Sequence, residues 1–152
     1  MPMIIRILQL TLPWISIIFL PKRSFKKYLP VSIFAAILVS GMCLLAGPLK
    51  WWNSAGGWKA RFLNDFSFIF GPFFVGTLWI FHFTFGNIKR YFIANLLMDS
   101  LFSFPLTYLY QKGKLFKLIK FKPLHIFLTF ISYSFIIYGF QMLIQKKAKK
   151  WR

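Results

Sequence analysis

The sequence predicts an all-α membrane protein, a polytopic bundle of transmembrane helices, on three observations. Hydrophobic residues make up 58% of the 152 residues, and the mean hydropathy is +0.61. The chain has 20 Lys and Arg residues against 2 Asp and Glu residues. These charges lie in short clusters between long uncharged segments, whereas a soluble nucleic-acid-binding protein would spread its basic residues along the chain. The composition therefore excludes nucleic acid as a partner and makes the lipid bilayer the expected environment.

The first hydrophobic segment, at about residues 3–20, is expected to cross the membrane as an uncleaved anchor. It is short and contains Arg6, whose long side chain can extend to the lipid headgroups. Pro21-Lys22-Arg23 follows it in place of a small-residue cleavage site. We therefore expect five spans, or four if this segment only lies on the membrane surface.

Four further apolar segments are long enough to cross a bilayer. A helix rises about 1.5 Å per residue and needs roughly 20 apolar residues to cross about 30 Å of hydrocarbon. Three of the segments contain no Asp, Glu, Lys or Arg, and one contains a single acid, Asp99. We expect these spans at about residues 30–49, 66–85, 91–110 and 124–144.

The connections between the spans are too short to form a soluble domain. The longest connection, residues 50–65, carries three tryptophans beside basic residues, a composition typical of the headgroup layer. Residues 1–152 are therefore expected to form a single transmembrane domain, and any function is carried out in the bilayer or at its surface.

The segment at about residues 114–122 is expected to form a short amphipathic helix in the membrane interface. On a helix its apolar residues would lie on one face and its lysines on the other. One interpretation is that this helix and the basic tail bind anionic lipid, and the alternative is that both only anchor the neighbouring spans. The lysines expected to contact anionic lipid are Lys114, Lys117, Lys120, Lys146, Lys147, Lys149 and Lys150.

The distribution of basic residues predicts the orientation of the chain. With five spans, 11 of the 20 Lys and Arg residues lie on the side of the C-terminal tail and 9 lie on the opposite side. The more basic side of a membrane protein stays in the cytoplasm, so we expect the tail there and the N-terminus outside.

Few residues are suited to catalysis. Two acids cannot supply a multi-carboxylate magnesium site, and neither His82 nor His125 belongs to an H-E-x-x-H pattern. The chain has no Gly-rich phosphate loop and no G-x-S-x-G elbow. The lone Cys43 can form neither an intramolecular disulfide nor a thiol metal cluster within one chain. We therefore expect no enzymatic activity, no metal site and no cofactor.

Asp99 is the residue most suited to a function, because a carboxyl group inside a span is costly unless it has a partner or takes up a proton. Asn95 and Ser103 are each four residues away and share its helix face. The short turn between the third and fourth spans brings His82 to the level of Asn95. We expect Asp99, Asn95, Ser103 and His82 to form a polar cluster, either a proton or cation site or a hydrogen-bonded clasp that fixes helix packing.

Small residues recur every three or four positions along the second span, which lets another helix approach closely. We expect an internal helix-packing face here rather than a dimer interface. The face comprises Ser32, Ala36, Ser40, Cys43 and Gly47.

Three motifs occur along the chain: Lys26-Lys27-Tyr28-Leu29-Pro30 before a span, Lys50-Trp51-Trp52 in a loop, and Phe70-Gly71-Pro72-Phe73-Phe74-Val75-Gly76 followed by Trp79-Ile80. They resemble an uncharacterised family of small multi-span integral membrane proteins of Bacillus-type (Firmicutes) bacteria. The similarity extends over most of the chain. It implies a bacterial plasma-membrane location and carries over no activity and no site residue.

The sequence favours a non-enzymatic membrane protein that acts as an accessory or assembly partner of a membrane complex. This interpretation rests on sparse catalytic chemistry beside plentiful packing faces and basic surface segments. The first alternative is a small transporter or channel that uses Asp99, with a homo-oligomer enclosing the pathway. The second is a pore-forming or immunity-type membrane protein, which small size and a Lys-rich tail suggest.

Overall fold

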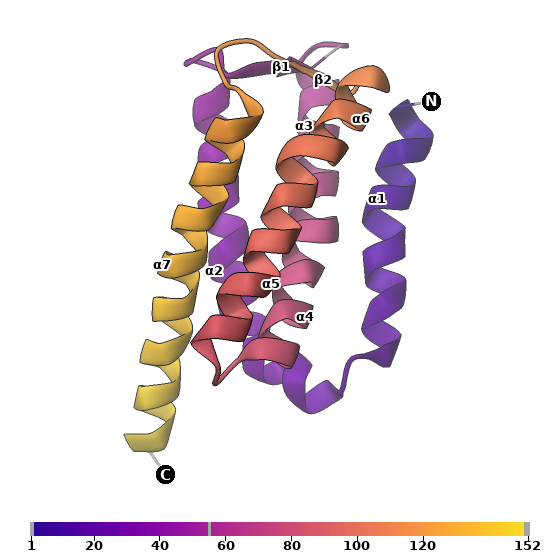
Figure 1. Ribbon diagram of the computed structural model, residues 1–152. Helices are drawn as coiled ribbons and strands as arrows, with labels where there is room; N and C mark the ends of the chain where they lie inside the picture. The colour runs from indigo at the N-terminus through magenta and orange to yellow at the C-terminus, as the bar shows by residue number, and fades with distance from the viewer. Residues whose placement is uncertain (1, 55, 151–152) are drawn as a thin grey trace.

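The structure is a computed structural model that describes residues 2–54 and 56–150. Its helices run up and down beside one another, and a small two-stranded sheet lies across one end (Figure 1). The elements in chain order are α1 (Pro2–Ser16), the 3-10 turn η1 (Ile17–Phe19), α2 (Lys22–Ala46), β1 (Trp52–Ser54), α3 (Gly57–Phe68), the π-helical turn η2 (Ile69–Phe73), α4 (Phe74–Thr84), α5 (Ile88–Leu101), the π-helical turn η3 (Phe102–Leu106), α6 (Thr107–Lys112), β2 (Phe116–Leu118) and α7 (Pro123–Lys150).

Four helical rods are long and apolar enough to cross a membrane, and they confirm the all-α fold. Each rod begins before the apolar segment from which it was predicted, because helical hydrogen bonding continues into charged residues that extend toward the headgroups. The early start matters most in the second rod, which begins nine residues before the expected residue 66. The rods are Lys22–Ala46, Gly57–Thr84, Ile88–Lys112 and Pro123–Lys147.

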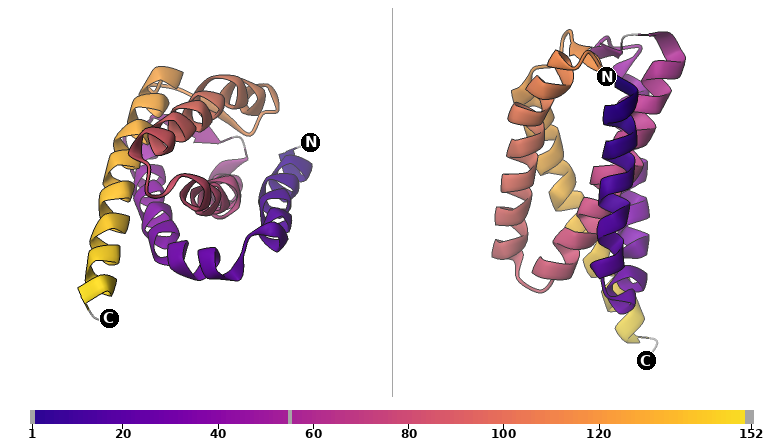
Figure 2. Two further views of the ribbon diagram at one scale, coloured as in Figure 1. Left: turned by 60° about the horizontal axis from the view of Figure 1, so that its bottom comes forward. Right: turned by 90° about the vertical axis from the view of Figure 1, so that its right-hand side faces the viewer.

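The first hydrophobic segment packs against the rod made of α3, η2 and α4 for most of its length (Figure 1). Its apolar helical stretch, Met3–Phe19, is shorter than the four rods. Trp14 Nε1 donates a hydrogen bond to the carbonyl of Phe70 at 2.8 Å. Gly71 permits the close approach, because a Cβ at that position would collide with the carbonyl oxygen of Gln9. The α3–α4 rod therefore lies centrally, with α1 on one side and α2, α5 and α7 around the rest (Figure 2).

The segment expected as an interfacial helix at about residues 114–122 is instead a β-strand with its flanking turns. β2 pairs antiparallel with β1, and Asn53 lies opposite Lys117. Beyond the strand, the Ile119 amide donates to the carbonyl of Trp51 at 2.9 Å. The connection from α2 to α3 and the connection from α6 to α7 lie at the same end of the bundle. Their backbone groups pair with each other there, so the second connection does not form a separate helix.

The core is built chiefly where α2 packs against α4, and most of the expected small-residue face of α2 is buried in the bundle. Ser32 and Ala36 are buried at 0% and 5% exposure, and Cys43 is 6% exposed. Ser40 is half-buried and donates to the carbonyl of Ala36. Gly47 lies against the guanidinium group of Arg61, which a Cβ at that position would displace.

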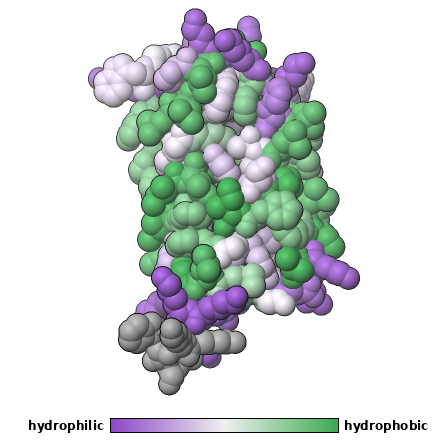
Figure 3. All heavy atoms as spheres, turned by 90° about the vertical axis from the view of Figure 1, so that its left-hand side faces the viewer, coloured by the Kyte–Doolittle hydropathy of each residue, from purple (hydrophilic) through white to green (hydrophobic). Residues whose placement is uncertain are grey.

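The outer surface divides into an apolar band and two polar ends (Figure 3). Large apolar side chains on the outer faces of the helices are exposed, among them Ile37, Leu44, Leu97 and Phe135. A soluble protein rarely exposes so continuous an apolar patch, whereas a lipid-facing surface consists of one. The band is consistent with a multi-pass membrane protein.

Candidate functional site

Asp99 lies near the middle of the rod made of α5, η3 and α6, and its side chain faces α7. It follows Ile88 by eleven residues, which is about 17 Å along a rod about 37 Å long. Asp99 is only 8% exposed, and its Oδ2 atom lies 3.5 Å from Ser134 Oγ on α7. Among the described residues, no Lys, Arg or His side chain pairs with it.

The Ser134 hydroxyl has one hydrogen and three acceptors within reach. The carbonyl of Phe130 lies at 2.9 Å, Asn95 Oδ1 at 3.2 Å and Asp99 Oδ2 at 3.5 Å. Hydrogen bonds weaken with distance, and a single hydroxyl donates one strong bond. Asp99 therefore receives the weakest of the three interactions that the Ser134 hydroxyl can make.

Tyr91 fixes α5 to α7 without involving Asp99. Its hydroxyl donates to the carbonyl of Ser134 at 2.9 Å, and Asn95 Nδ2 donates to the carbonyl of Tyr91 at 2.8 Å. Sequence reasoning placed Asn95 beside Asp99 but missed Tyr91 and Ser134. The signal available for Ser134 was a hydroxyl group inside the last apolar segment, where such a group needs a hydrogen-bond partner on its own or another helix.

The structure does not bring His82 to Asp99. His82 Nδ1 lies 2.8 Å from Ser24 Oγ of α2, and the ring packs at the edge of Trp79. The neighbouring residue Phe81 is the one that faces α5, with its ring centroid 5.2 Å from that of Tyr91. Successive helix residues point about 100° apart, so His82 shares the level of Asn95 but faces another helix.

Ser103 lies on η3 and is fully buried, at 0% exposure. Its hydroxyl has no hydrogen-bond partner among the described residues. Ser103 therefore has no hydrogen bond to Asp99, and it does not line the cavity beside that residue, so the four-residue spacing does not bring it into the cluster.

A small cavity of about 40 Å³ lies beside Asp99. Its polar lining consists of Asp99, Asn95, Ser134, Thr77 and Tyr91. The rest of its wall is apolar, but the cavity has room for water beside these polar groups, and water there would supply the hydrogen bonds that Asp99 lacks from the protein. The arrangement can hold a proton on the carboxyl group or a small cation beside it.

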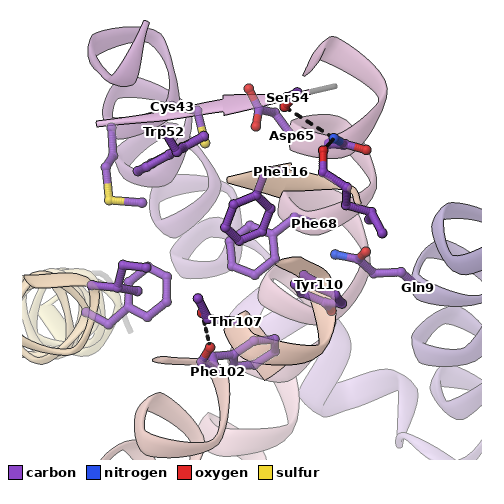
Figure 4. Close-up of a pocket in the computed structure, with 15 residues that line it drawn as sticks. Gln9, Cys43, Trp52, Ser54, Asp65, Phe68, Phe102, Thr107, Tyr110 and Phe116 are labelled. Carbon is purple, nitrogen blue, oxygen red and sulfur yellow. Dashed lines mark hydrogen bonds between the residues drawn. The ribbon is translucent and has the colours of Figure 1, made fainter. Parts of the chain in front are cut away.

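A second, larger cavity of about 80 Å³ lies beneath β1 and β2. Figure 4 shows Phe68 and Phe116 pointing into it, Ser54 on the side of the strands, and Phe102 and Thr107 on the opposite side. Its walls are mostly apolar, and its polar lining comprises Gln9, Cys43, Ser54, Asn64, Asp65, Thr107 and Tyr110.

Asn64 joins the elements around this cavity. Arg6 Nε of α1 donates to Asn64 Oδ1 at 2.6 Å. Asn64 Nδ2 in turn donates to the carbonyl of Leu115 at 2.7 Å and to Ser54 Oγ at 3.2 Å. One buried amide thus connects α1, α3, β1 and the segment before β2.

Asp65 is the second acid of the chain and was expected only at the edge of a span. α3 begins at Gly57, so Asp65 lies inside the helix and lines the cavity. Its Oδ2 atom lies 3.7 Å from Arg61 Nε, while the same guanidinium group donates to the carbonyl of Cys43. The signal for this site was present in the sequence, because the chain has only two acids. Asp65 directly precedes one apolar segment, and Asp99 lies inside another.

The lysines expected to contact lipid lie at both ends of the bundle. Lys114, Lys117 and Lys120 are exposed at the end that carries the sheet, and Lys146 and Lys147 are exposed at the opposite end. For Lys149 and Lys150 only the helical backbone lies within the described residues, and their side chains do not.

Within residues 2–54 and 56–150, no group of three or more His, Cys, Asp and Glu side chains could hold a metal ion. Comparisons of the chain with protein-family models, with curated proteins and with solved structures find no match. The similarity to a family of Bacillus-type bacteria therefore stays a prediction from the three motifs.

Proposed function

We propose that the protein is a small transporter or channel in which Asp99 is the intramembrane site for a proton or small cation. The observation that carries the proposal is a carboxyl group at 8% exposure, beside a cavity and with no cationic partner among the described residues. An ionised carboxylate in such a place is costly, so it takes up a proton or binds a cation.

The alternative is a hydrogen-bonded clasp between α5 and α7. Tyr91 and Asn95 already supply that connection through Ser134, at distances of 2.8 to 3.2 Å. Asp99 adds only the 3.5 Å interaction. A residue that contributes so little to the clasp and costs so much to bury is better explained by a function of the carboxyl group.

The proposed placement is five crossings of a bacterial plasma membrane, with α1 and η1 as the first. The two ends of the chain lie at opposite ends of the bundle (Figure 1), which is consistent with an odd number of crossings. The 11 basic residues on the side of the tail favour a cytoplasmic C-terminus. The 18 residues of α1 and η1 extend about 27 Å, close to the thickness of the hydrocarbon layer.

Flux measurements on reconstituted vesicles test the proposal. Purified protein is placed in liposomes that contain a pH-sensitive dye, and a potassium diffusion potential is imposed with valinomycin. In a parallel series Na⁺ or K⁺ uptake is followed at constant pH. We expect flux well above that of empty liposomes, and a loss of at least tenfold for Asp99→Asn.

Two variants serve as controls. Asp99→Glu keeps a carboxyl group and should retain part of the flux. Ser100→Ala changes the next residue, which is half-buried and whose hydroxyl bonds to the carbonyl of Leu96 on its own helix, and it should have no effect. Flux that is equal in wild type and Asp99→Asn, or no greater than in empty liposomes for every ion tested, contradicts the proposal.

The accessory or assembly role that the sequence favours stays a prediction beside this proposal. Native mass spectrometry of the protein, extracted gently from its own membrane at natural abundance, tests it. A stoichiometric partner would support that role, and a bare monomer or homo-oligomer would contradict it. Controlled expression tests the pore-forming prediction, since a pore collapses the membrane potential rapidly.

A further inference from the structure

The two cavities share part of their walls. Phe102 and Phe130 line both the cavity beneath the sheet and the cavity beside Asp99. Phe68 lines the first cavity and Phe73 lines the second. These four side chains, here called the phenylalanine layer, therefore separate the two cavities.

The phenylalanine layer is closely packed. The ring of Phe68 meets Phe102 edge-on at a centroid distance of 5.6 Å and stacks on Phe130 at 6.2 Å. Phe73 meets Phe130 at 5.8 Å. These are ordinary aromatic contact distances, so the rings pack directly against one another between the two cavities.

Two members of the layer lie on irregular turns of backbone. Phe73 is the last residue of η2 and Phe102 is the first residue of η3. Each π-helical turn contains a proline, Pro72 or Pro105, which lacks the amide hydrogen of a regular helix. Such turns are frequent at functional sites, because their weaker hydrogen bonding lets the helix adjust locally.

The cavity beneath the sheet is suited to hold water. Gln9 lines it, and the shielded Gln9 Oε1 atom has no hydrogen-bond partner among the described residues. Asp65 and Thr107 add polar groups at other positions on its wall. An unpaired polar atom beside a cavity of about 80 Å³ is satisfied most simply by bound water.

We propose that the two cavities are the two halves of one water route from the sheet end of the bundle to Asp99. The phenylalanine layer closes the route, and Asp65 is the first carboxyl group that a travelling proton meets. The inference rests on the proposed function for the role of Asp99 and adds the path, the barrier and the kind of ion.

The proton is favoured over a metal cation by the ligands available at Asp99. The side-chain oxygens in the lining of the small cavity are one carboxylate, that of Asp99, the amide oxygen of Asn95 and the hydroxyls of Ser134, Thr77 and Tyr91. A metal cation needs several ligand oxygens at once, six or more for a divalent ion, which a single carboxylate in a cavity of about 40 Å³ matches poorly. A proton needs one carboxyl oxygen and a chain of water.

Cysteine accessibility tests the route without depending on ion flux. Cys43, the single cysteine, is first replaced by alanine. Thr107→Cys then places a thiol in the cavity beneath the sheet, and Thr77→Cys places one in the cavity beside Asp99. The two threonines are matched, since each is at most 9% exposed and bonds to its own helix backbone.

The probe is Ag⁺ in chloride-free buffer, added to the face that carries the sheet. Reaction is read as protection of the thiol from later maleimide labelling in unfolded protein. We expect Thr107→Cys to react with Ag⁺ and Thr77→Cys to remain unreacted and open to the later maleimide. Phe102→Ala should raise the reaction rate of Thr77→Cys at least tenfold, because it opens the phenylalanine layer.

Phe104→Ala is the matched control, because Phe104 lies on the same π-helical turn as Phe102 and is 46% exposed. It should leave both reaction rates unchanged. Phe130→Ala, on the regular helix α7, replaces Phe102→Ala if the latter does not fold.

Three outcomes would overturn the inference. They are failure of Thr107→Cys to react with Ag⁺, equal reaction of both thiols with the layer intact, and failure of Thr77→Cys to react with Ag⁺ when either Phe102 or Phe130 is alanine in folded protein. If the thiols react as expected while Asp99→Asn leaves the proton flux unchanged, the route stands and the proposed function fails. If Asp99→Asn abolishes the proton flux while the thiols contradict the route, the proposed function stands and the route fails.

Discussion

At the scale of single residues, Asn64 and Asp99 show two opposite uses of a buried polar group. Asn64 is 7% exposed, and both its oxygen and its amide nitrogen are paired. Asp99 is equally buried but has only one long interaction. A fully paired group stabilises the fold, whereas a poorly paired one costs free energy and is retained for another reason.

Replacing Asn64 by alanine should therefore destabilise the protein substantially. The change leaves the Arg6 guanidinium group and the carbonyl of Leu115 without their partner. We expect a loss of about 2–4 kcal/mol in the free energy of unfolding, from one charged and one or two neutral hydrogen bonds. Denaturant unfolding in detergent micelles, followed by circular dichroism, measures it.

Asn53→Ala is the matched control for this change. Asn53 is an exposed amide on β1, and its replacement should alter stability by less than about 0.5 kcal/mol. Equal losses for Asn53→Ala and Asn64→Ala would contradict the role assigned to Asn64.

At the scale of elements, the sheet ties together two connections that are far apart in sequence. β1 and β2 are each only three residues long, yet they lie over the larger cavity and over Asn64. Trp51 stacks on Phe121 at a centroid distance of 4.7 Å and extends the same contact beyond the strands. The sheet thus holds the ends of α2, α3, α6 and α7 together.

A disulfide tests the pairing of β1 with β2. Asn53 and Lys117 are direct partners and both are exposed. Antiparallel partners have Cα atoms about 4.5–5.5 Å apart, within the range that a disulfide requires. In a Cys43→Ala background, Asn53→Cys with Lys117→Cys should oxidise readily, as mass spectrometry before and after reduction will show.

Asn53→Cys with Lys120→Cys serves as the comparison, since Lys120 lies beyond the strand. It should oxidise at least tenfold more slowly. If both pairs cross-link at the same rate, or neither does, residues 114–122 do not have the structure described here.

The sequence was sufficient for features that depend on neighbouring residues. Apolar length predicted the four rods, and the spacing of Asn95 and Asp99 on one helix predicted their shared face. It was insufficient wherever a distant segment decides the outcome. The lysines at 114, 117 and 120 fit a helix, but the partner of β2 lies more than sixty residues earlier.

The same limit explains the errors at the candidate site. The level of His82 follows from counting residues through a short turn, but its face depends on how α4 is rotated against α2. Ser134 comes from a helix whose rotation the sequence did not define. Asp65 was overlooked because helix α3 starts nine residues before the apolar segment used to predict it.

At the scale of the whole molecule, charge and hydropathy are arranged by depth. An apolar band surrounds the helices and basic residues lie at both ends (Figure 3). Asp65 and Asp99, the only acids, both line cavities inside the bundle. A chain with a net charge of +18 thus turns its two negative charges inward, as a cation or proton route would require.

The number of crossings has a direct test. Two reporters are fused in turn to the N-terminus and to the C-terminus. One is a fluorescent protein that folds only in the cytoplasm, and the other is a phosphatase that is active only outside. Five crossings predict phosphatase activity at the N-terminus and fluorescence at the C-terminus. The same reporter active at both ends would mean that α1 does not cross.

The most direct test of the central proposal is the reaction of Asp99 with dicyclohexylcarbodiimide, an apolar reagent that modifies protonated carboxyl groups within membranes. Modification of Asp99 is measured by mass spectrometry over a range of pH in native membranes. Tyr91, Asn95 and Ser134 face the carboxyl group, and no described Lys, Arg or His pairs with it, so changes in labelling report Asp99 itself.

We predict that Asp99 is labelled at low pH and progressively less as the pH rises, because the carboxyl group exchanges its proton with water whenever the phenylalanine layer opens. Asp99→Asn should abolish the label. Labelling that does not change with pH would mean a permanently protonated clasp and would contradict a proton site.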